Sequence, residues 1–280
     1  MTKPKRWQIL LLTAIGLALL TSARAWEDTM ADPVVRRTTV SLPDLPSDTP
    51  PLTLVLISDI HVAGPDMPPS RLARIVDQVN ALQPDIVAIA DDFISEKRSA
   101  THMYAASQAI APLAKLTPRL ATIAVPGNHD HWFDMPGITR ELEKAGITLL
   151  VNSATQAGPL AIGGLDDGYT GKDNVPATMS ALARLSGAQI MLGHSPDAFP
   201  QLPPSVRLML AGHTHCGQIA YPWGGAPAYL SEFGDRYACG RIDEGGKTLI
   251  VGAGLGTSLL PIRLFTKPTI WVVELVAPAT

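Results

Sequence analysis

Polar side chains that can bind metal ions follow five separate apolar segments of the chain, at the points where those segments end. They are carboxylates, imidazoles and one carboxamide, with no thiol among them. Imidazole and carboxylate groups are the usual ligands of first-row divalent metals, and oxygen and nitrogen donors without sulfur suit Mn, Fe or Zn. In chain order the residues are Asp59 and His61, Asp92, Asn128 and His129, His194, and His213 and His215. The pattern therefore predicts a metal centre.

Short apolar runs must position these side chains, and their lengths are typical of buried strands. The predicted strands cover residues 52–57, 85–90, 120–125, 189–192 and 206–211. In open α/β sheets ligands bind outside the carboxyl ends of the strands, so five converging ends would form one small cavity. Two clusters, Asp59–His61 and His213–His215, are pairs whose side chains would share a face of an extended strand. Glycine permits close backbone approach, and one precedes three of the predicted ligands, at Gly127, Gly193 and Gly212.

Apolar residues at helical spacing predict helices between these strands. The predicted helices cover residues 72–82, 103–116, 137–145 and 177–185. Further strands are predicted over residues 147–151, 160–163, 248–251 and 269–276. The first part of the chain alternates strand and helix, which indicates an α/β domain, and the later part is rich in strands, so the sheet is predicted to be mixed. No internal boundary is indicated, and we interpret residues 51–277 as one domain.

The first 25 residues differ from the rest of the chain. A basic start at Lys3, Lys5 and Arg6 is followed by an apolar run from Trp7 and then by an A-x-A cleavage pattern at residues 23–25. This order is typical of a secretory signal peptide. The alternative is an uncleaved N-terminal membrane anchor, since the run is only slightly short of a membrane span. Either interpretation predicts an exported body, in the periplasm or on the outer face of the cytoplasmic membrane. Residues 26–50 are interpreted as a linker with a first strand at 38–42.

Composition and charge narrow the class of partner. Hydrophobic residues make up 46% of the chain, which is enough for a substantial core and too much for a disordered chain. The formal net charge is −3 and the basic residues form no long run, so no nucleic-acid-binding surface is evident. An acidic chain can still bind a phosphate group when metal ions supply the positive charge.

The two cysteines, Cys216 and Cys239, allow one disulfide in an oxidising compartment. The alternative is that both are small buried residues without a disulfide. The sequence leaves the choice open, since it does not show whether the two Cα atoms approach closely enough. Cys216 directly follows the last predicted ligand, and we interpret it as structural rather than as a ligand.

Taken in order, the clusters resemble the five motifs of the calcineurin-like metallophosphoesterases. The resemblance extends from about residue 52 to residue 276 and rests above all on the blocks Gly127-Asn128-His129-Asp130 and Gly212-His213-Thr214-His215. The segments 213–218 and 254–263 are similar to those of the bacterial YaeI/YkuE-type branch, which is typically exported or membrane-associated. The resemblance implies a four-layer α/β/β/α sandwich with mixed sheets and a centre of two divalent or trivalent metal ions.

The resemblance also implies a role for each motif. One ion would be held by Asp59, His61, Asp92 and His215. The other ion would share Asp92 as a bridging ligand and would also bind Asn128, His194 and His213. His129 would face the substrate, and Asp130 would orient the ring of His129.

The implied reaction is hydrolysis of phosphomonoesters or phosphodiesters. A water shared by two metal ions loses a proton near neutral pH, and the resulting hydroxide would attack phosphorus. His129 would donate a hydrogen bond or a proton toward the leaving group. The export signal favours an envelope substrate, such as a lipid-linked or cell-wall phosphate, and a nucleotide or cyclic-nucleotide phosphodiesterase is the alternative. Loops at 131–133, 166–169 and 221–237 are predicted to frame the pocket. Two arginines, Arg236 and Arg263, could pair with phosphate or be ordinary surface charges.

One position departs from the family pattern. The second motif usually contains Gly-Asp, and here it is Asp91-Asp92. Asp91 could point away from the metals or add negative charge beside them. The departure leaves open a second class of function, a catalytically weak or inactive metal-binding scaffold with the same fold.

Overall fold

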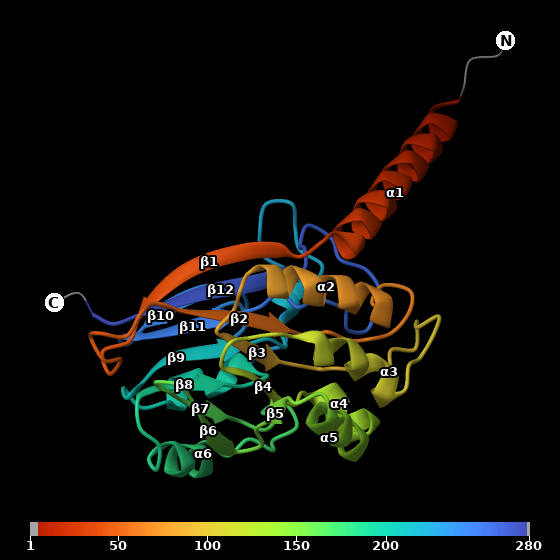
Figure 1. Ribbon diagram of the computed structural model, residues 1–280. Helices are drawn as coiled ribbons and strands as arrows, with labels where there is room; N and C mark the ends of the chain where they lie inside the picture. The colour runs from red at the N-terminus through yellow and green to blue at the C-terminus, as the bar shows by residue number, and fades with distance from the viewer. Residues whose placement is uncertain (1–4, 279–280) are drawn as a thin grey trace.

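Two six-stranded sheets lie face to face in a computed structural model that describes residues 5–278 (Figure 1). The first sheet has the strand order β1-β12-β2-β3-β4-β5. Its strands are β1 (Val34–Ser41), β12 (Thr269–Val276), β2 (Leu52–Ser58), β3 (Ile86–Ala90), β4 (Ala121–Val125) and β5 (Thr148–Leu149). β12 runs antiparallel to β2, and the other neighbouring pairs are parallel.

The second sheet has the order β10-β11-β9-β8-β7-β6. Its strands are β10 (Gly240–Glu244), β11 (Lys247–Val251), β9 (Val206–Ala211), β8 (Ala188–Leu192), β7 (Leu160–Gly164) and β6 (Ser153–Ala157). The outermost pair at each edge is antiparallel and the inner pairs are parallel. Both sheets are therefore mixed, as the sequence predicted.

Helices cover the outer face of each sheet. The first sheet carries α2 (Pro69–Ala81), α3 (Ala106–Ile110), η1 (Ala111–Lys115), α4 (Asn128–Phe133) and α5 (Met135–Lys144). The second carries α6 (Val175–Leu182) and η2 (Pro196–Gln201), and a further 3-10 turn, η3 (His215–Gly217), follows β9. The predicted four-layer α/β/β/α architecture is confirmed.

Three apolar layers hold the sandwich together, and β2 shows how its sequence serves two of them. Leu54 and Leu56 belong to the layer between the two sheets, whereas Val55 and Ile57 pack in the layer under α2. Alternate side chains of a strand point to opposite faces, so a strand that is buried on both faces is apolar throughout. This explains why the parallel strands were visible as unbroken apolar runs.

The differences from the predicted elements have physical causes. The helix predicted over 103–116 is the short α3 followed by η1, with Pro112 at the start of η1, where proline supplies no backbone N–H. The strand predicted over 147–151 shrinks to the two residues of β5. β6 and β10 were not predicted, because both are polar edge strands of the second sheet without an apolar run. The first strand begins at Val34, earlier than predicted.

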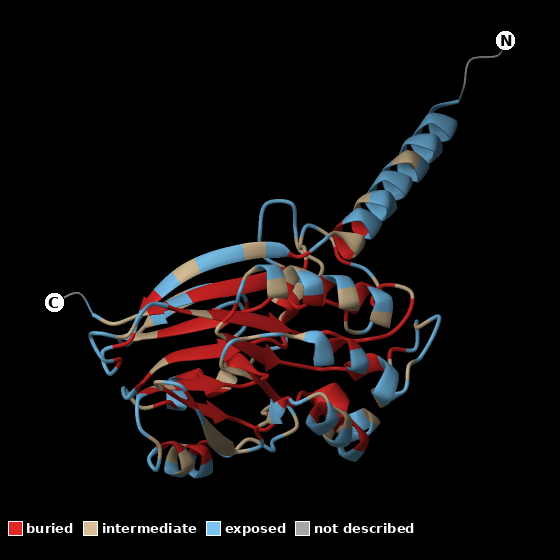
Figure 2. Cartoon of the chain, viewed as in Figure 1, coloured by how far each residue is buried: buried red, intermediate tan, exposed pale blue. Residues whose placement is uncertain are grey.

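The N-terminal helix α1 (Arg6–Met30) extends away from the sandwich (Figure 1). Most of it is exposed, and burial begins only in its last two turns, at Ala25, Asp28 and Thr29 (Figure 2). By length and composition α1 could cross a membrane. Its last turns are fixed to the body, because the Phe265 amide donates to Asp28 Oδ2 at 2.8 Å.

Candidate metal centre

The carboxyl ends of β2, β3, β8 and β9, together with the first turn of α4 after β4, bring the predicted donors together. Three sets of residues each offer ligand atoms that lie within 4.8 Å of one another. These sets are Asp59, His61 and His215; Asp59, Asp92 and His194; and His61, Asp92 and His129. All of these side chains are buried.

Asp92 lies between the two halves of this cluster. Its Oδ2 is 3.6 Å from His61 Nε2 and 3.2 Å from His194 Nε2. On the β2 side, His61 Nε2 approaches His215 Nε2 at 3.1 Å. On the other side, His194 Nε2 approaches His213 Nδ1 at 3.1 Å. Asp92 is therefore the side chain that could contact ions on both sides.

Among the buried polar atoms that have no hydrogen-bond partner within the described residues, four belong to predicted ligands: Asp59 Oδ2, His61 Nδ1, Asn128 Oδ1 and His213 Nε2. A buried polar atom without a partner is costly in a folded protein, so such atoms indicate a ligand. Each belongs to a residue that the sequence predicted to bind metal. The donor set, of carboxylates, imidazoles and a carboxamide, fits divalent first-row ions.

The backbone at the two ligand pairs is not extended, and here the prediction from strand geometry was wrong. Asp59 and His61 have φ of 48° and 49°, and His213 and His215 have φ of 69° and 50°. These residues follow the strands β2 and β9 and adopt the left-handed region, which is costly for residues other than glycine. Strained backbone of this kind is concentrated at functional sites, where the surrounding structure holds it in place.

Two of the predicted glycines are required by close approach. A Cβ atom at Gly127 would collide with Asp92 Oδ1, and one at Gly212 would collide with Asp59 Oδ2. Gly193 is different, because its nearest neighbour is the flexible terminal carbon of Met209 at 3.1 Å. The close approach predicted from sequence is therefore confirmed at two of the three positions.

Burial and mutual contact shift the titration of the cluster. Burial raises the pKa of Asp59 to about 6. Burial also opposes the charge of Asp92, but the adjacent His194 and His61 rings lower its pKa below the ordinary value. Burial and His194 lower the pKa of His213 to about 3. Burial likewise lowers the pKa of His215. An ionised Asp92 and neutral His213 and His215 leave their lone pairs free for a cation. His194 differs, because burial opposes its charge but the adjacent Asp92 outweighs burial and raises the pKa of His194 to about 10.

Asp91, the departure from the family pattern, is occupied by the backbone. Its Oδ1 accepts from the Ile60 amide at 2.6 Å, between the two ligands Asp59 and His61. Burial, and then the neighbouring Asp130, raises the pKa of Asp91 well above its ordinary value. Through the hydrogen bond to Oδ1 the Asp91 carboxyl group supports the ligand loop, while Oδ2 has no hydrogen-bond partner among the described residues.

The role predicted for Asp130 is wrong. Its Oδ1 accepts from the Phe93 amide at 2.8 Å and its Oδ2 from the Gly127 amide at 3.1 Å, so the carboxyl group holds two backbone turns. The His129 ring is held instead by Glu96, whose Oε2 lies 2.8 Å from Nδ1. Burial lowers the pKa of His129, but this hydrogen bond outweighs it and the net shift is upward. Glu96 was not predicted from the sequence. The only feature that could have pointed to it is its position four residues after the predicted ligand Asp92.

A cavity of about 460 Å³ opens beside His194. Its walls include Asp166, Tyr169 and Tyr229, from two of the loops that were predicted to frame the pocket. Trp132, from the third predicted loop, packs against His129 with ring centroids 5.0 Å apart. Neither Arg236 nor Arg263 lines this cavity, so the proposed phosphate contact has no support. Arg236 is paired with Glu244 and Arg263 is fully buried.

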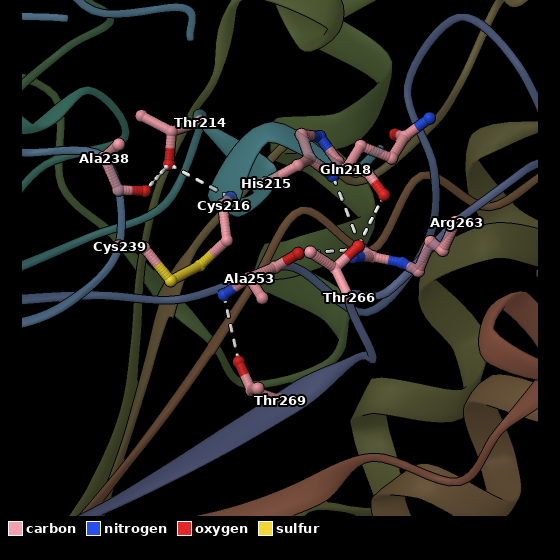
Figure 3. The surroundings of a disulfide bond; sticks show 10 residues. All are labelled: Thr214, His215, Cys216, Gln218, Ala238, Cys239, Ala253, Arg263, Thr266 and Thr269. Carbon is pink, nitrogen blue, oxygen red and sulfur yellow. Dashed lines mark hydrogen bonds between the residues drawn. A yellow bond between two sulfur atoms is a disulfide. The ribbon is translucent and has the colours of Figure 1, made fainter. Parts of the chain in front are cut away.

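Cys216 and Cys239 form a disulfide, so the open question from the sequence is resolved (Figure 3). Cys216 has a left-handed φ of 54° and directly follows His215. Beside the disulfide, Thr214 Oγ1 donates to the Ala238 carbonyl at 2.6 Å. The ligand loop after β9 is therefore fastened to the segment that leads into β10.

Comparison with known proteins decides the family. The family model described as "Calcineurin-like phosphoesterase" matches residues 52–217, which is more than half of the chain and contains every predicted metal ligand. The chain belongs to the calcineurin-like phosphoesterases.

Two bacterial relatives of this calcineurin-like phosphoesterase confirm the resemblance to the YaeI/YkuE-type branch. The metallophosphoesterase YkuE of Bacillus subtilis (strain 168) is 32% identical over 231 residues, which cover 79% of this chain and 78% of YkuE. Phosphodiesterase YaeI of Escherichia coli (strain K12) is 31% identical over 235 residues, which cover 81% and 83% of the two chains.

An animal relative extends the comparison. A Danio rerio protein named "Transmembrane protein with metallophosphoesterase domain" is 32% identical over 244 residues, which cover 81% of this chain and 53% of that protein. This calcineurin-like phosphoesterase thus spans about half the length of the first animal relatives that it matches.

Proposed function

We propose that this chain is a metal-dependent phosphoesterase with a dinuclear centre. The observation that carries the proposal is the position of Asp92, whose Oδ2 lies within 3.6 Å of imidazoles from both halves of the cluster. One ion would be held by Asp59, His61, Asp92 and His215. The second would be held by Asp92, Asn128, His194 and His213. When bound, such ions act as Lewis acids that activate water and neutralise phosphoryl oxygens.

The residues of the chain supply the rest of the chemistry. His129 is the proton donor toward the leaving oxygen, because it borders the cluster and is not needed as a ligand. Glu96 holds Nδ1 of that ring at 2.8 Å. This contact leaves Nε2 to face the substrate and stabilises the protonated ring. Efficient general acids have pKa values near the working pH, and the upward shift at His129 agrees with this role.

We propose that the substrate is a phosphodiester in the cell envelope. The second candidate function is an inactive metal-binding scaffold. The name of YaeI supports a diester. Only Asp91 favoured the scaffold, and its Oδ1 is held by the Ile60 amide at 2.6 Å. Comparing bis-p-nitrophenyl phosphate with p-nitrophenyl phosphate under Mn²⁺, Fe²⁺ and Zn²⁺ separates diesterase, monoesterase and scaffold.

The test of the centre is Asp92→Asn in the full chain, with metal content measured by mass spectrometry beside turnover. Removal of a shared ligand should reduce the content of both ions and abolish turnover. Asp48→Asn, in an exposed loop, is the matched control and should change neither. Full metal content in Asp92→Asn would contradict the assignment of Asp92 as the bridging ligand.

We also propose that α1 is retained as an anchor rather than cleaved. The candidate cleavage site at Ala25 lies inside α1 and is buried, and the Ala25 carbonyl accepts from Thr29 Oγ1 at 2.6 Å. The transmembrane name of the Danio rerio relative supports a membrane protein. Mass spectrometry of the chain extracted from membranes tests this, and a mature chain beginning at Trp26 would contradict it.

A further inference from the structure

Large apolar side chains surround the place where α1 joins the body. We call this set the apolar collar, and it consists of Trp26, Trp223, Leu259, Leu260, Ile262 and Phe265. All six side chains are exposed, with Trp223 81% and Leu259 71% accessible. They come from the end of α1 and from two loops that lie on one another, since the Ala220 amide donates to the Leu264 carbonyl at 2.8 Å. Contiguous exposed apolar surface of this kind marks an interaction site.

The helix itself indicates how the collar lies relative to a membrane. Trp7 and Trp26 flank its apolar run, and both are exposed. At 1.5 Å per residue these two rings are about 28 Å apart along the helix, close to the thickness of a bilayer's hydrocarbon core. Tryptophan is enriched at both membrane interfaces. If α1 spans a bilayer, Trp26 lies at the interface on the side of the body.

One collar loop reaches beyond Trp26 along the helix. An apolar groove is lined on one side by α1 from Ala18 to Trp26 and on the other by Pro261, Ile262 and Leu264. This stretch of helix is about 12 Å long. The loop is therefore level with the part of α1 that enters the bilayer, at the depth of about 5–10 Å where interfacial apolar faces are buried.

The charge beside the collar suits anionic headgroups. A cavity of about 800 Å³ opens next to it, and the collar residue Phe265 lines it. Its charged lining residues are four basic ones, Arg24, Arg36, Arg241 and Lys267, and one acidic one, Asp28, which pairs with Arg24 at 2.9 Å. Basic residues near a membrane surface are attracted by anionic lipids within a Debye length.

The collar is connected directly to the metal centre. Gln218 Nε2 donates to the Leu260 and Ile262 carbonyls at 3.1 and 3.0 Å, and the Gln218 amide donates to the His215 carbonyl at 2.9 Å. Between Ile262 and Phe265, the buried Arg263 places its Nη2 at 3.5 Å from His215 Nδ1 (Figure 3). The loop that carries the apolar side chains thus supports a predicted metal ligand.

We propose that the apolar collar is a membrane-contact surface, which enters the headgroup region of the bilayer spanned by α1 and holds the metal centre at that surface. The partner is a bilayer that contains anionic lipid. The inference goes beyond the proposed function, because it assigns a partner, and it favours phosphodiesters borne by lipids over soluble ones.

Tryptophan fluorescence of the full chain in vesicles tests the contact without any assay of activity. The Trp223 component is the difference between wild type and Trp223→Phe, in phosphatidylcholine–phosphatidylglycerol vesicles with and without bromine on the acyl chains. We expect bromine to reduce this component by about half, since an interfacial indole contacts the upper acyl chain. The component from Trp271, obtained with Trp271→Phe, is the comparison, because this side chain is buried although it lines the cavity beside the collar, and it should change much less than the Trp223 component. An unquenched Trp223 component overturns the proposal, and a dimer formed through the collar would then identify a second copy as the occupant.

A double variant, Trp223→Ser with Leu259→Ser, tests the consequence at two collar residues outside the hydrogen bonds that support His215. We expect it to lower the hydrolysis of phosphatidyl-p-nitrophenol in vesicles about tenfold, because the surface no longer holds the centre at the lipid. Hydrolysis of soluble bis-p-nitrophenyl phosphate and metal content should stay unchanged. Val151→Ser, at another exposed apolar side chain, is the control. If the double variant hydrolysed the lipid substrate as fast as wild type does, and the soluble substrate likewise, the proposed role of the collar would be overturned. If wild type hydrolyses neither substrate, the proposed function fails, and the fluorescence result still decides the membrane contact.

Discussion

Loss of the Cys216–Cys239 disulfide should lower the stability of the fold by an amount set by the loop that it closes. The two cysteines are 23 residues apart in sequence. In the chain-entropy account, a loop of this length contributes about 3 kcal/mol by restricting the unfolded chain. For a domain of this size each kcal/mol moves Tm by about 2–4 °C, so the expected decrease in Tm is about 6–12 °C.

The measurement is thermal unfolding of the full chain in detergent with saturating Mn²⁺. Wild type is compared, with and without a reductant, with the double variant Cys216→Ala and Cys239→Ala. The reductant should lower the Tm of wild type and leave that of the variant unchanged. A difference in Tm below about 2 °C would refute the reasoning, because the closed loop would then not restrict the unfolded chain as calculated.

The same variant should also bind metal more weakly, which a purely global stabiliser would not cause. Cys216 directly follows His215, and both have left-handed backbone that the disulfide helps to hold. Calorimetric titration of Mn²⁺ into metal-depleted folded protein, well below Tm, measures this effect. Unchanged affinity would show that the ligand loop keeps its conformation without the disulfide.

Three further predictions concern single side chains. His129→Ala should keep its metal content and lose about 10²–10⁴-fold in turnover, as measured by steady-state kinetics. Glu96→Gln, which removes the negative charge beside Nδ1 of the His129 ring, should lose about 10–100-fold in turnover. Equal turnover in wild type and both variants would exclude His129 as the proton donor. Asp91→Asn should retain full turnover and metal content, because an amide oxygen can accept the hydrogen bond that the Ile60 amide donates to Asp91 Oδ1. A loss of metal, measured by mass spectrometry, would show that the carboxyl group itself is needed. Lys97→Met should destabilise the fold by about 3–5 kcal/mol in urea unfolding, since Lys97 Nζ lies 2.6 Å from the buried Asp66 and its loss leaves an unpaired charge; addition of Asp66→Asn should restore part of that stability, and no restoration would contradict the ion pair as the cause.

The strands of the core and the residues of the metal centre could be predicted because their physics is local. A strand buried on both faces must be apolar throughout, and its end is visible where Asp59 or His213 interrupts the apolar run. The edge strands β6 and β10 have no such pattern, because they need only one neighbour and little burial.

What the sequence did not reveal depends on contacts between distant segments. Glu96 could be assigned to the His129 ring only when β3 and β4 were placed side by side. Asp130 was assigned to the same ring because it follows His129, yet the turn of α4 directs its carboxyl group to backbone amides. The left-handed backbone at Asp59 and His61 likewise follows from the packing around them and has no signature in residue type.

The hydrogen bond from the His213 amide to Asp59 Oδ1, 2.8 Å long, joins two parts of the molecule that the apolar layer alone would let slide. Asp59 extends from a strand of one sheet and His213 from a strand of the other. A small shift of one sheet over the other would separate ligands that we propose for the same ion, such as Asp59 after β2 and His215 after β9. Metal binding at this centre therefore depends on how the two sheets are aligned. Substitutions in the apolar layer between the sheets should weaken metal binding even where the chain stays folded.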